Sequence, residues 1–107
     1  MMRPMSEEIS ALRRVLAPPA ADGRRAESWE PIPPGPVRAA VAVESVEVSD
    51  AARGATIETR AVFTVWGNAI APGDRIAWRG QIYAVRSVAP ASLNPPISTV
   101  TAVRIEG

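Results

Sequence analysis

The chain of 107 residues concentrates its prolines in one stretch. Six of its 11 prolines fall between residues 18 and 36, and none occurs between Val37 and Ala71. Proline fixes φ and has no backbone N–H to donate, so residues 18–36 can form neither a helix nor a central strand. We therefore expect an N-terminal segment with an extended proline-rich arm over residues 1–36, and a folded domain over residues 37–107.

The proline-free part alternates apolar and polar residues with a period of two, which is typical of half-buried β-strands. Residues 37–43 alternate in this way, and residues 57–65 give the clearest strand of the chain. Shorter strands are predicted at 75–78, 81–88 and 97–105. The pattern predicts an all-β fold, a small antiparallel β-barrel or sandwich of about five to six strands.

The alternation changes phase after Val43, because Val46 and Val48 are apolar where polar residues would continue the pattern. A bulge, a sharp bend or the end of the sheet is expected there. Residues 49–56 are mostly small and polar and include a glycine, so they are predicted to form a long, mobile loop. Such a loop is either a functional projection or a hairpin tip without a role.

Three further connections are predicted from turn-forming residues. Pro72-Gly73-Asp74 is a turn, because proline presets φ and glycine tolerates a positive φ. Arg79-Gly80 is a tight hairpin connection, and residues 90–96 are predicted as a loop.

The first 17 residues fit two structures. Residues 6–8 resemble a helix N-cap with an acidic first turn, and Ile9, Leu12 and Leu16 fall at helical spacing. Residues 12–16 fit a short edge strand as well. The pattern by itself favours the helix.

The chain contains no Lys, no His and no Cys. These absences exclude the usual ligand sets of zinc, iron–sulfur clusters and haem, as well as thiol catalysis, histidine-based triads and disulfides. Glu44 and Glu47 are three residues apart and do not share a strand face, so we interpret them as solvated charges rather than a catalytic pair. We expect no enzyme activity, no metal and no cofactor.

Twelve Arg face 11 acidic residues, which gives a net charge of +1. A dedicated nucleic-acid binder usually carries a basic excess or a basic stripe, and this chain carries neither. No apolar run approaches the ~20 residues of a membrane span, and the N-terminus does not resemble a signal peptide. We expect a soluble chain, made in a cytoplasm, with no membrane partner.

Three tryptophans, Trp29, Trp66 and Trp78, fall at strand edges or ends. They could stack on a ligand, but packing into the core or a subunit interface is the favoured interpretation. Three arginines flank the predicted hairpin and could face a phosphate backbone. The favoured interpretation is that these arginines lie exposed on a strand face or form salt bridges between subunits. They are Arg75, Arg79 and Arg86.

Residues 71–88, with the sequence APGDRIAWRGQIYAVRSV, resemble the signature of phage head–tail joining proteins. Upstream, Leu12-Arg13-Arg14-Val15, Asp22-Gly23 and Trp29 resemble the preceding elements of that family in the same order, which would make residues 12–16 a strand. The proline-rich arm departs from the family pattern, and so does the 49–56 loop, which is shorter than the corresponding loop of many family members. Eight positions match the motif, and we expect them to supply residues of the core. They are Pro72, Asp74, Arg75, Ile76, Trp78, Gly80, Tyr83 and Val88.

The resemblance implies a head-closure (stopper) or joining protein of a tailed phage, a prophage or a gene transfer agent. Such a protein forms a homo-oligomeric ring, six-fold or twelve-fold, beneath the portal and adaptor rings and above a tail terminator or other tail protein. It retains packaged double-stranded DNA, which passes through without specific binding. Its place would be the head–tail interface of the virion, after assembly in the cytoplasm of a bacterial host.

By position, the resemblance also implies a long channel-facing loop. Repeated around a ring, this loop would obstruct a duplex about 20 Å wide. Glu44, Glu47 and Asp50 would then form rings of negative charge that let DNA slide. The proposed loop residues are Val46, Glu47, Val48, Ser49, Asp50, Ala51, Ala52, Arg53, Gly54, Ala55 and Thr56.

A different class of protein also fits the pattern. A monomeric SH3-like or OB-like barrel that binds nucleic acid or a peptide could carry the same turn and hairpin. Ring formation separates the two hypotheses, because a ligand-binding barrel would be monomeric, with a salt-dependent affinity for nucleic acid.

Overall fold

The computed structural model describes residues 5–33, 35–50, 52, 54–67 and 69–105. None of these residues is helical, so the described part of the chain holds no helix long and apolar enough to cross a bilayer. The regular elements are seven strands: β1 (Glu7–Leu16), β2 (Glu27–Pro31), β3 (Val37–Asp50), β4 (Gly54–Trp66), β5 (Arg75–Trp78), β6 (Gln81–Leu93) and β7 (Pro96–Arg104).

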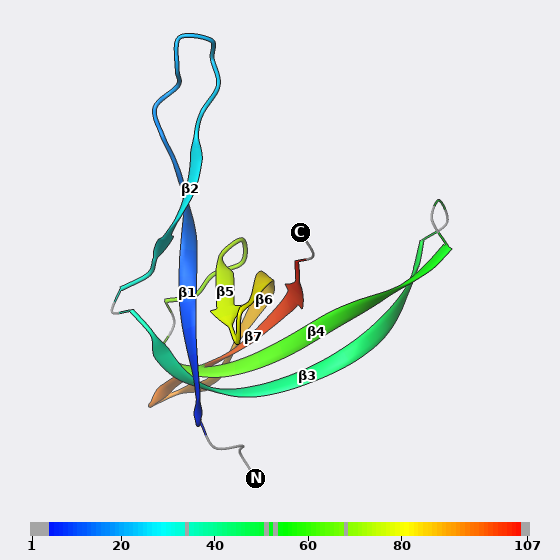
Figure 1. The fold of residues 1–107 in the computed structure, drawn as a ribbon. Coiled ribbons are helices and arrows are strands. Elements are labelled where there is room, and N and C mark those ends of the chain that lie inside the picture. Colours follow the sequence, from blue (N-terminus) through cyan, green and yellow to red (C-terminus); the bar gives the residue numbers. More distant parts are fainter. Residues whose placement is uncertain (1–4, 34, 51, 53, 68, 106–107) are drawn as a thin grey trace.

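Six of the strands close into an antiparallel barrel, and β2 lies outside it (Figure 1). The strand order is β2-β1-β3-β4-β7-β6-β5, and a further pairing of β1 with β5 closes the sheet on itself. β1 pairs with β3 through Glu7–Ile9 and with β5 through Ser10–Leu12. The predicted all-β fold is confirmed, and it is a barrel because one strand bridges both ends of the sheet.

β1 is a strand where the N-terminal pattern favoured a helix. Its inward positions Ile9 and Ala11 are only 1% and 6% exposed, and its backbone pairs with three other strands. These pairings outweigh a local helical spacing that offers no comparable burial. The strand implied by the family resemblance is the correct alternative. β1 also lies before residue 37, so the barrel includes part of the segment that we expected to precede it.

β1 and β2 form a hairpin that extends beyond the barrel (Figure 1). β2 pairs with Leu12–Leu16 of β1 and is the edge strand of the sheet. A proline-rich segment can occupy an edge because the outward backbone groups have no strand to bond. Residues 27–31 are therefore extended, but they pair with β1 as an edge strand instead of standing apart from the sheet.

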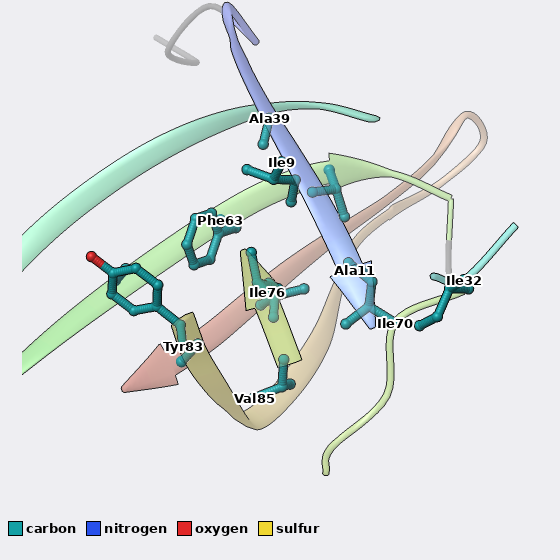
Figure 2. Close-up of a cluster of buried hydrophobic side chains, with 13 residues drawn as sticks. Ile9, Ala11, Ile32, Ala39, Phe63, Ile70, Ile76, Tyr83 and Val85 are labelled. Atoms are coloured by element: carbon teal, nitrogen blue, oxygen red, sulfur yellow. The ribbon is translucent and has the colours of Figure 1, made fainter. Parts of the chain in front are cut away.

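The core fills the barrel, where side chains from all six closing strands meet (Figure 2). The largest fully buried side chains are Phe63, Ile9, Ile76 and Val100. Phe63 meets the rings of Trp78 and Tyr83 edge to face, with ring centroids 6.0 and 5.6 Å apart. Aromatic pairs of this geometry add about 0.5–1.5 kcal/mol beyond the burial of their area.

β3 and β4 leave the barrel together as a two-stranded ribbon (Figure 1). They pair without a register shift from Ala39↔Val65 to Asp50↔Gly54, while β4 pairs with β7 only over Arg60–Trp66. The predicted bulge is absent from this ladder, and the sheet does not end after Val43 but narrows there to the two strands β3 and β4. Beyond that point both ribbon faces are open to solvent, so neither face needs a continuous apolar row.

Two predicted loops are shorter in the structure than the sequence indicated. The predicted loop over 49–56 is wrong in extent, because β3 continues to Asp50 and β4 begins at Gly54. The predicted loop over 90–96 is wrong as well, because β6 and β7 pair as far as Leu93↔Pro96. A register shift beside Pro90 accommodates its missing N–H within a strand. In both hairpins backbone pairing continues through small or polar residues.

Candidate functional site

The segment predicted to face a channel forms the outer half of the β3–β4 ribbon. Val46 lies opposite Glu58, and Val48 lies opposite Thr56. Of the predicted residues, 46–50 and 54–56 belong to strands and Ala52 lies in the turn at the tip. Ala51 and Arg53 fall outside the described residues. The segment is thus a projecting β-hairpin and not a long loop.

Strand alternation distributes the side chains of the ribbon between two faces. Glu47 lies directly opposite Ile57 and shares its face with Val43, whereas Glu44 and position 50 belong to the other face. Ile57 is 74% exposed and Val43 is 50% exposed. The acidic residues predicted to form rings of charge therefore do not all share one face, because Glu44 and Glu47 lie on opposite faces. One face therefore combines a carboxylate with two exposed aliphatic side chains.

An ion-pair network lies where the ribbon leaves the barrel. Glu58 Oε2 lies 3.5 Å from Arg60 Nη2, and Glu58 Oε1 lies 3.7 Å from Arg86 Nη2. Partly exposed pairs of this length contribute at most about 1 kcal/mol. They link the base of the ribbon to β6, because Glu58 belongs to β4 and Arg86 to β6.

Asp74 of the 71–88 motif is a buried anchor between β1 and the turn that precedes β5. It is 4% exposed, and its two carboxylate oxygens accept hydrogen bonds from Arg13 Nε (3.1 Å), Arg13 Nη2 (2.9 Å) and the Ala71 N–H (2.8 Å). The hydrogen bond to Asp74 and the charge of Asp74 raise the pKa of Arg13 above its ordinary value. Spacing could not indicate this pair, although the family resemblance includes both residues.

The hairpin between β5 and β6 has the predicted tight turn. Arg79 and Gly80 have φ values of 49° and 75°, and two positive values are what a type I′ turn requires. Glu7 of β1 accepts a hydrogen bond from Trp78 Nε1 (3.2 Å) and pairs with Arg79. These contacts fasten the turn to the first strand of the barrel.

The other motif positions differ in their burial. Some form the core as expected, and others lie in turns at the surface. Ile76 and Tyr83 are buried, Arg75, Trp78 and Val88 are partly buried, and Pro72 and Gly80 are exposed.

The three tryptophans have three different environments. Trp78 packs against the core, as predicted. Trp29 stacks on Arg75, whose guanidinium carbon lies 4.0 Å from the ring centroid. Trp66 is 55% exposed, and its place in a subunit interface stays a prediction. Of the three arginines at the hairpin, Arg75 takes part in this stack, while the other two make ion pairs within the chain.

Two grooves lie on the surface near the turn before β5. The first, the Trp29 groove, has a volume of about 530 Å³ and lies between the β1–β2 hairpin and residues 71–75. The second has a volume of about 450 Å³ and is mainly apolar. Residues lining the Trp29 groove include Arg13, Arg14, Glu27, Trp29, Pro72, Asp74 and Arg75. Residues lining the apolar groove include Ile32, Pro33, Val65, Trp66 and Ile70.

The chemistry available on these surfaces is stacking, ion pairing and apolar burial. Over the described ranges, no three side chains of His, Cys, Asp or Glu gather as a metal-binding group. The projecting ribbon and the Trp29 groove are therefore candidates for macromolecular contact.

Comparison with known proteins reveals a likeness in structure. No protein-family model matches the chain, and no curated protein matches its sequence. The fold is similar to that of a chain in a solved structure described as the virion of a native gene transfer agent (GTA) particle, with a TM-score of 0.72 and 15% sequence identity. The match covers 99% of this chain and 100% of that chain. At this identity the likeness establishes a shared fold.

Proposed function

We propose that the chain is a structural subunit of a tailed phage or gene transfer agent, a head–tail connector of the head-closure or joining type. The observation that carries this proposal is the full-length similarity to a chain of a gene transfer agent virion. The family resemblance of residues 71–88 supports the same class. In this role the protein is a building block of the virion at the head–tail interface, without catalytic activity, assembled in the cytoplasm of a bacterial host.

In this proposal, copies of the chain form a ring and each β3–β4 ribbon points toward the ring axis. Beyond the Glu44↔Arg60 pair, six further residue pairs lead to Asp50↔Gly54 at the tip. At about 3.3 Å per residue, this part of the ribbon spans about 20 Å. A DNA duplex has a similar width of about 20 Å, so ribbons that converge on the axis can obstruct the channel.

The charge of the ribbon suits a channel that retains DNA without binding it. The face that carries Glu44 would repeat this carboxylate around the axis, and such a ring repels phosphate groups. The net charge of +1 is consistent with this role, because the chain has no basic excess that would hold the duplex.

The ring would have different partners on its two sides. We assign the portal and adaptor rings to the upper side and a tail terminator or other tail protein to the lower side. The β1–β2 hairpin projects from the barrel and is suited to reach a neighbour or the ring above (Figure 1). Its edge strand β2 offers backbone groups to a further strand.

The proposal is tested by shortening the ribbon in assembled particles. Replacement of residues 49–55 by Asn-Gly joins Val48 to its partner Thr56 and removes the tip while keeping the rest of the ribbon. Filled heads should then lose DNA, because the ribbons no longer meet at the axis. Nuclease-sensitive DNA and the fraction of empty heads in cryo-electron micrographs measure this loss.

A variant of unchanged length is the matched control. Ser49→Thr with Ala55→Thr alters the same residue pair but keeps the reach of the ribbon, so DNA retention should stay normal. Unchanged retention in the shortened variant would refute the plug role. Absence of the protein from the head–tail junction would refute the connector role itself.

A further inference from the structure

Arg75 in the Trp29 groove has a positioned guanidinium without a carboxylate. The group stacks on Trp29 at 4.0 Å, and within the described part of the chain no Asp or Glu forms an ion pair with it. Stacking fixes the plane of a guanidinium while leaving its edge N–H groups free to donate. Arg75 is thus oriented to receive an acceptor from outside the chain.

A second guanidinium in the groove is only loosely held. Arg14 lies directly opposite Trp29 in the β1–β2 hairpin, and its Nη1 lies 3.9 Å from Glu27 Oε2. Both side chains of this pair are about half exposed, at 55% and 45%, so the pair contributes little. Arg13 differs, because Asp74 holds it with two hydrogen bonds. The groove therefore offers two donors to a ligand, Arg14 and Arg75.

The surroundings favour a single carboxylate over a nucleic acid. Glu27 and Asp74 line the same groove, and Glu30 lies on the same hairpin. A duplex would bring a row of phosphates against these carboxylates, whereas one glutamate can lie between the two guanidinium groups. Trp29 and Pro72 add apolar surface for an aliphatic neighbour of that glutamate.

One face of the β3–β4 ribbon carries this combination. Glu47 is exposed, and within the described residues no Arg pairs with it. Ile57 lies directly opposite Glu47 and leaves 74% of its surface exposed. A carboxylate beside an exposed aliphatic side chain is complementary to a guanidinium beside an indole ring.

We propose that the Trp29 groove of one copy binds the Glu47 face of the β3–β4 ribbon of a second copy. The carboxylate of Glu47 pairs with Arg75 and Arg14, and Ile57 packs against Trp29. The inference rests on the proposed ring and identifies its subunit interface. The β1–β2 hairpin and the ribbon project on different sides of the barrel in Figure 1, so the contact is head to tail and repeats around a ring.

The two faces of the ribbon then have separate roles. Glu47 and Ile57 lie against the neighbouring copy, and the face with Glu44 and position 50 stays open toward the channel. Because the charges are partly exposed, they orient the contact more than they strengthen it, and salt weakens their contribution. Burial of Ile57 and the indole ring supplies the apolar part of the attraction.

Cysteine cross-linking tests whether the two surfaces meet. The chain has no cysteine, so Ser45→Cys on the Glu47 face and Pro72→Cys in the groove give one defined pair. Oxidation of assembled particles, and of concentrated purified protein, should give a ladder of covalent multimers on a non-reducing gel. Absence of multimers in both samples would overturn the proposal.

Charge reversal in the same double-cysteine background tests the ion pair. Arg75→Glu and Glu47→Arg should each reduce cross-linking about tenfold, the equivalent of one charge-assisted contact, and the two together should restore most of it. Glu44→Arg on the opposite face is the matched control and should leave cross-linking unchanged. Far-UV circular dichroism reports whether each variant keeps the barrel.

The outcomes separate this inference from the proposed function. Rings at the head–tail junction with no effect of either reversal would overturn the interface and leave the connector role intact. Failure of the folded double variant to recover cross-linking would also overturn the pairing. A folded wild-type protein that is absent from the junction would refute the connector role, whatever the cross-linking shows.

Discussion

Arg13 and Asp74 are 61 residues apart in sequence, yet their side chains join the first strand to the turn before β5. The carboxylate is nearly buried, and it accepts three hydrogen bonds that a smaller side chain would leave unmade. Replacing such a residue lowers stability, because its hydrogen-bond partners then lose their acceptor inside the protein. The polar contact therefore sets the position of the turn that lines the Trp29 groove.

Asp74→Ala should lower the free energy of unfolding by about 2–4 kcal/mol, because charge-assisted hydrogen bonds and the Ala71 N–H lose their acceptor. Urea denaturation followed by far-UV circular dichroism measures the change. Arg13→Gln should destabilise to a similar extent, because it leaves the buried Asp74 carboxylate without its charged partner. Equal stability of Asp74→Ala and the wild type would show that the anchor has no energetic role.

Tyr83→Ala should lower the free energy of unfolding by about 3–5 kcal/mol, since it removes a buried ring that contacts Phe63 and Trp78. Thermal and chemical denaturation both report the effect. Leu93→Ala, at a side chain 85% exposed, is the control and should change stability by less than about 0.5 kcal/mol. A similar small shift for Tyr83→Ala would contradict its place in the core.

At the scale of elements, the strands divide into those that close the barrel and those that extend past it. The outer part of the β3–β4 ribbon pairs only with itself, because the β4–β7 ladder ends at Arg60. The β1–β2 hairpin likewise extends beyond β5, whose pairing with β1 ends at Leu12. These projections contribute little to the core, and they are free to serve as contact surfaces.

The ribbon and the barrel should therefore be energetically separate. Replacing residues 49–55 by Asn-Gly should shift the midpoint of thermal unfolding by no more than a few degrees, the equivalent of less than about 0.5 kcal/mol. Differential scanning calorimetry of the purified variant measures this shift. A large loss of stability would mean that the tip contacts the barrel, and it would confound the test of DNA retention.

At the scale of the whole molecule, a small barrel carries two projections that differ in charge pattern. A domain of this size buries only about two thirds of its unfolded surface, so contacts with other chains would add materially to its stability. A head-to-tail ring requires two different contact surfaces on each subunit, one for each neighbour. The architecture thus agrees with a subunit that is completed by its neighbours.

The purified chain should not bind duplex DNA at physiological salt, because its charges balance and its ribbon carries carboxylates on both faces. Fluorescence anisotropy with a labelled duplex, titrated at several salt concentrations, tests this expectation. Binding with a steep salt dependence, by a monomeric protein, would instead favour the alternative of a nucleic-acid-binding barrel.

The sequence by itself determined the local features of the chain. Period-two alternation identified the strands at 37–43 and 57–65, and Arg79-Gly80 identified a tight turn, because these signals depend on neighbouring residues only. The proline distribution likewise marked where β3, the longest strand, begins. The motif at 71–88 added an expectation of a connector-type barrel, but the evidence for its function lies in comparison and experiment.

Only the tertiary structure decided which strands pair and where. β1 became a strand because β3 and β5 supply its backbone partners, a fact that no local pattern contains. Most of the predicted loop at 49–56 forms strand ends instead, because β3 and β4 continue to pair with each other as far as Asp50 and Gly54. This pairing uses backbone hydrogen bonds and does not require apolar side chains. The contacts of Arg13 with Asp74 and of Arg75 with Trp29 join distant residues, so barrel closure alone brings them together.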